Sequence, residues 1–326
     1  MKKSNTLKVL SIGKEKHSNK TPIFIEREIK AFLKGYFPLE IKGVGLKGKG
    51  ALGYIKSYFQ LKKIIKQEQP NIIHAHYSFS GVISTLASPK RNVVVTFLGS
   101  DVFFKKLSVK FAKWLVTKKA AEIIVVSDRI LATFSKQDNI TTIPQGINTD
   151  LFKPMDKKSC AEELGWDTNK ISILFPSSQK RFEKNYDLAK EAIEELKLEF
   201  DVSFHSLEDV EPNQIPIYLN AADIVLLTSK WEGSSNVTKE AMACNKVVVS
   251  TDVGDASELF SNIDGYFTTD HSIENVVLKL KQAIAFIKEN DHTQGRQRIL
   301  ELGLDDGTTA RKIFGVYERV VENQRR

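Results

Sequence analysis

Short apolar segments that alternate with helical stretches constrain the fold of this chain more than any other feature. Strand-sized runs at 7–12, 72–75 and 122–126 are each followed by turn residues or by a helical spacing of apolar side chains. Continuous apolar strands separated by helices are typical of parallel sheets that are covered on both faces. The alternation therefore predicts an α/β protein with doubly wound parallel sheets.

A second strand–helix series begins at residue 171, and a turn-rich stretch separates it from the first. That stretch, 144–154, mixes Pro, Gly, Asn and Asp without periodicity, so we expect the hinge between two domains there. A chain of 326 residues is long enough for two cores.

We expect an N-terminal domain at 1–155, a C-terminal domain at 156–305 and an amphipathic helix at 306–326. This helix could pack on either domain, and we assign it to the N-terminal one.

The composition, with 41% hydrophobic and 27% charged residues, gives no sign of disorder or of a membrane-embedded class. The apolar runs are far shorter than the roughly 18 residues of a membrane-spanning helix, and the one near the start is too short for a signal peptide. Cys160 and Cys244 lie far apart and belong to no CxxC or Cys/His motif, which fits a reducing compartment. We expect a cytoplasmic location, peripheral at the inner face of the membrane.

The net charge of +8 is divided unevenly along the chain. Residues 1–155 contain 27 Lys and Arg against 10 Asp and Glu, a charge of +17, whereas 156–326 contain 21 against 30, a charge of −9. A basic half favours phosphate-rich partners such as anionic lipids, a diphosphate-bearing acceptor or nucleic acid, or it serves solubility alone. The segment 53–66 combines Lys and aromatic residues at helical spacing. It is either a helix on an anionic membrane surface or an ordinary outer helix.

Two glutamates, Glu232 and Glu240, flank a Gly-Ser-Ser-Asn run that follows a strand and leads into a helix. Gly233 and the serines favour a turn, with Ser234 or Ser235 capping the helix, so that one carboxylate projects from the loop and the other from the helix. Loop amides and a helix N-terminus form an anion site between them, while each carboxylate can accept hydrogen bonds from hydroxyl groups. This arrangement suits a sugar nucleotide. A capped surface helix with solvated acids fits the spacing as well.

A second polar segment, 176–185, also lies between a strand and a helix and contains Arg181 and Lys184. These cations could neutralise a leaving diphosphate. The sequence contains no DxD pair, so a diphosphate site without a metal would need them. The alternative is a solvated basic loop.

The order and spacing of several segments along nearly the whole chain resemble the retaining glycosyltransferases of family 4. The matching segments are 71–76, 94–101, 143–154, 221–229, 232–244, 247–254 and 258–259. This resemblance implies the GT-B fold, in which two Rossmann-like domains face each other across a cleft. It also implies a nucleotide-sugar donor, UDP- or GDP-linked, with no cofactor and no metal.

The resemblance also implies a role for each matching residue. Arg181 and Lys184 would contact the donor phosphates, Glu232 a hydroxyl of the transferred sugar, and Glu240 the ribose. The catalytic candidates are Glu232, Arg181, Lys184 and Asp101. The remaining donor-binding candidates are Leu207, Val210, Gly233, Ser234, Ser235, Asn236 and Val237. Retention would proceed on one face of the sugar, with a donor phosphate oxygen helping to take the acceptor's proton.

The first half departs from the family pattern at two places. Leu98 stands where many relatives have His, so Asp101 is expected to carry part of the polar role. A polar loop at 13–20 replaces the Gly-rich loop of many relatives. The acceptor-side candidates are His17, Ser18, Asn19, His76 and Gly99. For His74 and His76 a structural histidine is the alternative.

The function that the sequence predicts is a metal-independent, hexosyltransferase-type retaining glycosyltransferase. Its acceptor would be a saccharide or a lipid-linked saccharide in polysaccharide or glycoconjugate assembly, and an anionic membrane surface would be a further partner. One alternative is a sugar-nucleotide 2-epimerase of the GT-B fold. Another is a basic nucleic-acid-binding protein, although the sequence has no recognisable nucleic-acid motif.

Overall fold

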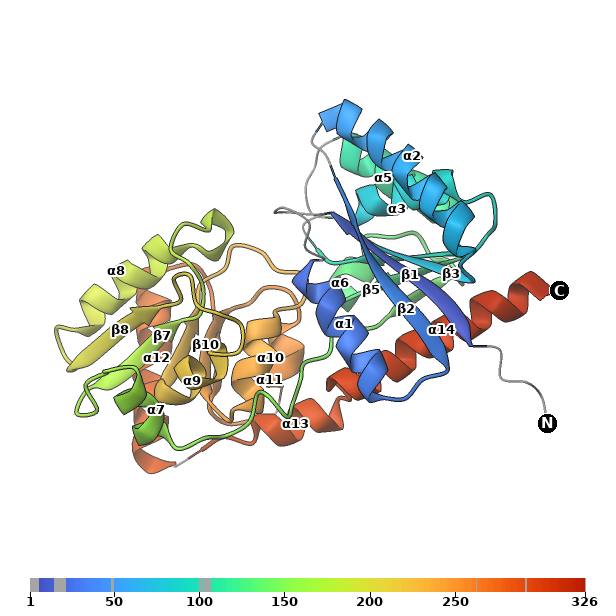
Figure 1. Cartoon of the computed structure of the whole chain (residues 1–326). Helices are drawn as coiled ribbons and strands as arrows, with labels where there is room; N and C mark the ends of the chain where they lie inside the picture. Colours follow the sequence, from blue (N-terminus) through green and yellow to red (C-terminus); the bar gives the residue numbers. More distant parts are fainter. Residues whose placement is uncertain are drawn as a thin grey trace. The chain divides into compact units, whose positions relative to one another are not determined.

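The computed structural model describes residues 6–14, 22–47, 50–99, 102, 107–261, 263–290 and 292–325. The chain forms two compact units (Figure 1). Unit 1 contains Met1–Gln145 together with Asp306–Arg326, and unit 2 contains Gly146–Asp305. The segment 146–155, which we assigned to the N-terminal domain, therefore lies in unit 2.

Unit 1 is built on a parallel sheet of six strands in the order β2-β1-β3-β4-β5-β6. The strands are β1 (Leu7–Lys14), β2 (Leu39–Leu46), β3 (Ile72–His76), β4 (Val93–Phe97), β5 (Glu122–Val125) and β6 (Ile140–Thr142). Every residue of β3, β4 and β5 is buried, because helices cover both faces of the sheet. The uninterrupted apolar runs in the sequence arise from this double coverage.

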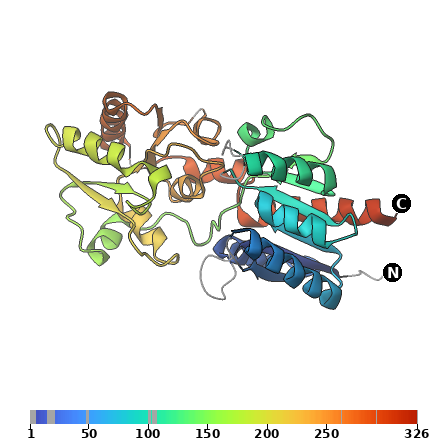
Figure 2. The same ribbon diagram turned by 90° about the horizontal axis from the view of Figure 1, so that it is seen from above.

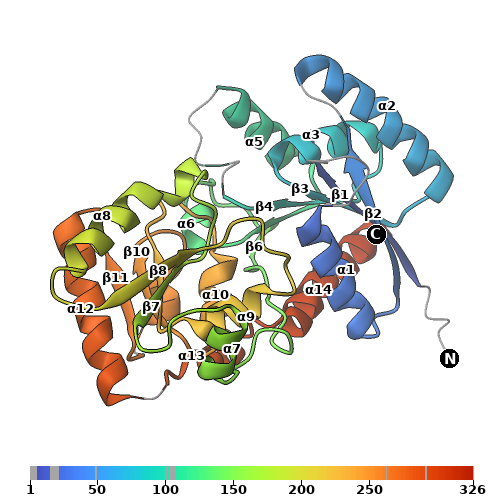
Figure 3. The same cartoon turned by 60° about the vertical axis from the view of Figure 1, so that its left-hand side comes forward.

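Two layers of helices cover the sheet of unit 1. One layer contains α2 (Gly50–Glu68), α3 (Ser78–Ala87) and α5 (Leu107–Lys119), with α3 lying between the other two (Figures 2 and 3). The opposite face carries α1 (Ile23–Lys34) and the C-terminal helix α14 (Asp306–Arg325). A short helix, α6 (Asp128–Leu131), follows β5. None of the helices in the described part of the chain has the length and apolar content needed to cross a membrane.

Unit 2 is built on a parallel sheet of five strands in the order β11-β10-β9-β7-β8. The strands are β7 (Ile171–Phe175), β8 (Val202–Ser206), β9 (Ile224–Leu227), β10 (Val247–Thr251) and β11 (Tyr266–Thr269). The helices are α7 (Lys157–Glu163), the 3₁₀ helix η1 (Phe182–Lys184), α8 (Tyr186–Leu196), α9 (Ile215–Ala221), α10 (Asn236–Ala243), α11 (Ala256–Phe260), α12 (Ile273–Glu289) and α13 (Gly295–Glu301). Two parallel α/β sheets confirm the predicted fold class.

The segment that enters unit 2 is held by the last helix before the chain leaves it. The guanidinium of Arg296, on α13, donates hydrogen bonds to the carbonyl oxygens of Thr149 and Phe152 at 2.9 and 2.8 Å. The N–H of Ile147 donates to the carbonyl of Leu304 at 2.9 Å. These bonds satisfy loop carbonyls that are otherwise costly to bury, and they explain why unit 2 begins before residue 155.

Helix α14 is fastened to unit 1 through Tyr317. Its side chain is fully buried, its ring stacks on that of Phe32 in α1 with centroids 5.8 Å apart, and its hydroxyl lies 2.8 Å from Nδ1 of His74 in β3. Aromatic packing and a buried hydrogen bond stabilise the same contact. The helix therefore completes the core on this face of the sheet.

Removing this hydroxyl is expected to weaken unit 1. Tyr317→Phe keeps the ring but removes the buried hydrogen bond to His74, which costs about 0.5–1.5 kcal/mol. Tyr36→Phe is the matched control, because Tyr36 is 94% exposed. Chemical denaturation, followed by near-ultraviolet circular dichroism, should show a lower unfolding midpoint for Tyr317→Phe alone. Equal midpoints in the two variants would contradict the role of this contact.

Candidate functional site

The turn between β9 and α10 contains the Gly-Ser-Ser run and ends in a capped helix. Of the two serines considered as caps, Ser235 occupies the cap position, and its side chain accepts a hydrogen bond from the N–H of Thr238 at 3.4 Å. Glu232 lies in the turn and Glu240 lies within α10, where it is only 3% exposed. The two carboxylates therefore come from different local structures, as the glycine and serines indicated.

The structure brings this turn together with the second polar segment. The ammonium of Lys184, at the end of η1, donates a hydrogen bond to Oε1 of Glu232, and both side chains are largely buried. Ser229 Oγ donates to the same carboxylate oxygen at 2.8 Å. The backbone joins them too, since the N–H of Lys230 donates to the carbonyl of Glu183 at 2.9 Å. Two segments that are 48 residues apart thus form one polar cluster.

Arg181 lies at the edge of this cluster and is more exposed. Its guanidinium forms an ion pair with Glu183 at 2.6 Å, and 55% of its side chain is accessible to solvent. Burial opposes ionisation of Glu183, but hydrogen bonds from its own backbone and from Arg181 outweigh it and lower the pKa of that carboxyl. A planar guanidinium has five N–H donors, so an exposed Arg181 can reach an anion while it keeps this pair.

A lysine beneath the turn was not recognised in the sequence. Lys239 is fully buried, and its ammonium donates to Ser234 Oγ at 2.9 Å. Ser234 in turn donates to Asp255 at 2.5 Å. Burial lowers the pKa of Lys239, while the charges of Asp255 and Glu240 oppose that shift. This partly buried chain of polar groups holds the turn in place.

Gly254 lets the loop after β10 approach the turn closely. Its φ is +63°, and a Cβ there would lie 3.1 Å from Cβ of Glu232 and 3.3 Å from the carbonyl oxygen of Gly233. The hydroxyl of Thr251 also donates to the carbonyl of Ser229 at 2.8 Å. Both the left-handed backbone and the crowding favour glycine at this position.

A third loop joins the cluster from β8. Glu208 accepts hydrogen bonds from Ser178 Oγ at 2.8 Å and from the N–H of Gln179 at 2.7 Å, and the backbone bond is the main cause of its lowered pKa. Leu207 and Val210 flank this acid and are half-buried. The loops after β8, β7 and β9 therefore meet at the carboxyl edge of three adjacent strands. Open α/β sheets bind ligands at this edge.

The acceptor-side candidates are less completely described. His17, Ser18, Asn19 and Asp101 lie outside the described residues. Gly99 has a φ of +121°, and its carbonyl accepts a hydrogen bond from the N–H of Val102 at 2.9 Å.

His76, by contrast, is buried in a cluster with His74 and Glu28. Glu28 Oε1 lies 3.3 Å from Nδ1 of His74 and 3.6 Å from Nε2 of His76. The sequence pointed to both histidines but not to Glu28, because only packing of α1 on the face of the unit 1 sheet brings it there. A carboxylate and two imidazoles within 4.8 Å of one another have the chemistry of a metal site.

The same atoms already have partners in the protein. Nδ1 of His74 contacts Tyr317, Nε2 of His74 lies 2.7 Å from Thr96 Oγ1, and Nε2 of His76 lies 3.1 Å from Ser11 Oγ. Burial opposes the charge on Glu28, but the charges of the two histidines hold its pKa well below the usual range. Burial and the neighbouring His74 lower the pKa of His76. The arrangement fits a buried structural network.

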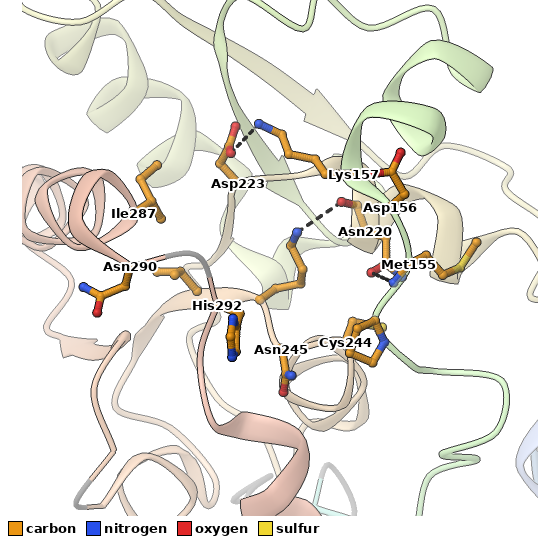
Figure 4. Close-up of a pocket in the computed structure, with 13 residues that line it drawn as sticks. Met155, Asp156, Lys157, Asn220, Asp223, Cys244, Asn245, Ile287, Asn290 and His292 are labelled. Carbon is orange, nitrogen blue, oxygen red and sulfur yellow. Dashed lines mark hydrogen bonds and ion pairs between the residues drawn. The ribbon is translucent and has the colours of Figure 1, made fainter.

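A cavity of about 600 Å³ lies at the opposite edge of the unit 2 sheet (Figure 4). Asp223 and Lys246, which precede β9 and β10, are among its lining residues. Asp223 pairs with Lys157 at 2.5 Å, and Lys246 donates to the carbonyl of Asn220 at 3.1 Å. None of the candidate site residues lines this cavity, so the cluster at the carboxyl edge is a separate place.

Two known families match the chain in the same order as the two units. Residues 28–151 match "Glycosyltransferase Family 4", and residues 183–294 match "Glycosyl transferases group 1". The chain belongs to glycosyltransferase family 4. The second match contains Lys184, Glu232 and Glu240, the residues whose positions define the cluster.

The chain has distant relatives among proteins named as glycosyltransferases. An uncharacterized glycosyltransferase of Methanocaldococcus jannaschii is 26% identical over 68% of this chain and 66% of its own length. The Escherichia coli UDP-Gal:alpha-D-GlcNAc-diphosphoundecaprenol alpha-1,3-galactosyltransferase is 24% identical over 68% of each chain. A Bacillus subtilis glycosyltransferase named for teichuronic acid biosynthesis is 29% identical over 61% of this chain. The chain spans about two thirds of the length of these relatives, and 58% in the last case.

Several solved structures share the fold of this chain. Sucrose-phosphate synthase from Thermosynechococcus elongatus superposes with a TM-score of 0.81 at 15% identity, covering 97% of this chain and 100% of that one. Anabaena HepE in complex with UDP-glucose superposes with a TM-score of 0.73 at 17% identity, covering 96% of this chain and 100% of that one. A Listeria monocytogenes protein described as a UDP-N-acetylglucosamine 2-epimerase gives 0.63 at 13% identity, covering 98% and 97%. Because the epimerase shares the fold, fold alone does not distinguish the two activities.

Acid should destabilise unit 1 of this glycosyltransferase through His76. Because its pKa is lowered in the fold, the unfolded chain takes up the proton first, near pH 6.5. Stability is then lost as the pH falls below that value, by at most about 1.4 kcal/mol per pH unit. Denaturation midpoints at pH 7 and 5.5 should differ less in His76→Gln than in the wild type. His292→Gln changes an exposed histidine, so its midpoints at the two pH values should differ as much as those of the wild type. If the midpoints of His76→Gln also differed as much as those of the wild type, His76 would not be the cause of the acid sensitivity.

Gly254→Ala should disturb the turn that carries Glu232. The left-handed φ costs alanine about 1 kcal/mol, and crowding against the turn adds about 1–3 kcal/mol. Gly165→Ala is the matched control, since Gly165 has a φ of +66° but nothing within 4 Å of its added Cβ. Thermal unfolding of the two variants separates crowding from backbone strain. If the two variants lost equal stability, the close approach of Gly254 to the turn would make no contribution.

Proposed function

We propose that this family 4 glycosyltransferase is a retaining, metal-independent enzyme that transfers a hexose from a UDP- or GDP-sugar. Its acceptor is a saccharide or a lipid-linked saccharide in polysaccharide or glycoconjugate assembly. The observation that carries the proposal is the contact between Lys184 and Glu232. It joins a cation suited to phosphate and a carboxylate suited to sugar hydroxyls at the ligand-binding edge of the sheet. The activity for which the Escherichia coli relative is named supports a diphosphate-linked acceptor.

Different residues of the cluster would contact different parts of a bound sugar nucleotide. When the donor binds, its diphosphate competes with Glu232 for Lys184, and the carboxylate then accepts hydrogen bonds from the sugar. Arg181 meets the phosphates from the exposed side. The amides of 233–236 and the N-terminus of α10 face the β-phosphate. Glu240 holds the ribose, and the base lies against the loop containing Leu207 and Val210.

Transfer requires charge stabilisation rather than a protein nucleophile. As the bond between the sugar and the β-phosphate breaks, Arg181 and Lys184 neutralise the charge that develops on the departing diphosphate. The acceptor hydroxyl attacks from the same face, and a phosphate oxygen of the donor takes its proton. The configuration at the anomeric carbon is therefore retained. Asp101 and the acceptor-side residues would contribute from unit 1.

A thermal-shift panel of UDP-, GDP-, ADP- and dTDP-sugars tests the donor assignment. One donor should raise the unfolding temperature, since a ligand at 100 times its Kd adds about 2.7 kcal/mol. Glu240→Gln should reduce this shift through weaker binding, of the order of tenfold, because a buried hydrogen bond to a charged group is lost. Glu274→Gln, an exposed acid at the start of α12, is the control and should behave as the wild type.

Product analysis with the stabilising donor decides the reaction. Transfer to an added undecaprenyl-diphosphate saccharide with retained configuration, unaffected by a chelator, supports the proposal. Epimerised sugar nucleotide formed from donor alone would replace the transferase with a 2-epimerase. If none of the four donors stabilised the protein at about 1 mM, a concentration that would reveal weak binding, the donor site would be refuted.

A further inference from the structure

Helix α2 exposes a stripe of apolar side chains on its outer face. Leu52, Ile55 and Phe59 are 75%, 54% and 63% exposed. Their spacing of three and four residues places them on one face of the helix, while Leu61 on the inner face is fully buried. Single exposed apolar residues are common, but a contiguous stripe is not.

Helix α5 carries a similar stripe. Leu107, Phe111 and Trp114 are 82%, 59% and 56% exposed, again at spacings of four and three. The rings of Phe111 and Trp114 lie with centroids 5.8 Å apart, so they form one apolar surface. Val116, on the inner face of the helix, is fully buried.

The two stripes lie on the same layer and toward the same edge of unit 1. Helices α2 and α5 flank α3 in one layer over the sheet (Figures 2 and 3). Each apolar stripe begins in the first turn of its helix. Because a helix that follows a parallel strand starts at the strand's carboxyl end, both stripes lie toward the carboxyl edge of the sheet.

Lysines share the outward faces of these helices. Lys56, Lys63 and Lys66 project from the arc of α2 that carries its stripe, and Lys110 and Lys118 from that of α5; all five are exposed. Acidic residues are scarce around them. From 43 to 121 the sequence contains 14 Lys and Arg against two acids, Glu68 and Asp101, and Glu68 is paired with Lys42 at 2.5 Å.

We propose that the outer faces of α2 and α5 form a docking surface for an anionic lipid bilayer. Apolar side chains among lysines match such a surface, since they enter the boundary between headgroups and acyl chains while the ammonium groups meet lipid phosphates. A nucleic acid would match the lysines and could stack on Phe59, Phe111 and Trp114. It would leave the aliphatic Leu52, Ile55 and Leu107 in water, so the bilayer explains more of the surface.

Docking in this way places the carboxyl edge of the unit 1 sheet next to the headgroups. The acceptor-side residue Gly99 follows β4 at that edge. A lipid-linked substrate holds its diphosphate at the same depth, so it could reach the enzyme without leaving the bilayer. The docking surface itself does not depend on the donor chemistry proposed above, because all of its residues lie in unit 1.

Vesicle co-sedimentation tests the proposal with the full chain. The protein should bind vesicles of 70% phosphatidylcholine and 30% phosphatidylglycerol at 0.1 M NaCl, bind pure phosphatidylcholine at least tenfold more weakly, and lose binding at 0.5 M NaCl. Lys63→Gln with Lys118→Gln should weaken binding about 25-fold, since each lysine near the surface contributes about fivefold. Phe59→Ser with Trp114→Ser should weaken it at least tenfold.

Matched controls lie in unit 2. Leu278→Ser replaces an apolar residue that is 49% exposed on α12, and Lys190→Gln with Lys288→Gln removes two exposed lysines; both should bind as the wild type. Each variant must keep the wild-type melting temperature. If the stabilising sugar nucleotide still raises that temperature as it does in the wild type, unit 2 is intact. Failure of docking is thereby distinguished from failure of the donor assignment.

Several outcomes would overturn the proposal. These are no binding to the anionic vesicles, equal loss in the unit 2 controls, or unchanged binding after the apolar substitutions. A DNA oligonucleotide that binds as tightly as the vesicles and remains bound by the Phe59 and Trp114 variant would favour a polyanion site instead. As a second measurement, lipids brominated in the acyl chain should quench emission in the wild type and much less in Trp114→Phe.

Discussion

A parallel sheet must be covered on both faces, and in unit 1 this constraint is met with a helix from the far end of the chain. Helix α14 packs beside α1, and Tyr317 joins it to β3 through His74. Without that helix, the apolar side chains of β3 and β4 on this face would lose part of their cover. The packing of α14 on unit 1 determines how the chain divides into units. The buried network of Glu28 with its two histidines depends on it too.

The same kind of dependence on tertiary structure appears in unit 2. No helix or strand there carries the whole site. Loops after three adjacent strands are held together by Lys184 with Glu232, by Glu208 with the β7 loop, and by the glycine at 254. Parallel topology brings these loops to one edge, and their side chains then fix the distance between them. A site built in this way keeps its shape while the loop residues remain available to vary.

Sequence alone predicted the alternation of strands and helices, the turn after β9 and a serine cap on α10, because these follow from local spacing and turn chemistry. The family resemblance pointed to the segments that the structure brings together. What could not be predicted depends on contacts across the sequence. Glu28 lies beside the histidines only because α1 packs on the unit 1 sheet, and Lys239 looked like an ordinary helical lysine. The start of unit 2 at Gly146 depends on hydrogen bonds from Arg296, 150 residues further along.

The return of α14 also affects how this protein folds as it is synthesised. Domains made first usually fold first. Unit 2 is continuous in sequence and is complete once Asp305 has been made, whereas unit 1 still lacks the helix that carries Tyr317. The apolar face that α14 covers therefore stays open to water, or to chaperones, until α14 has been made. Unit 1 therefore starts before unit 2 along the chain but is completed after it.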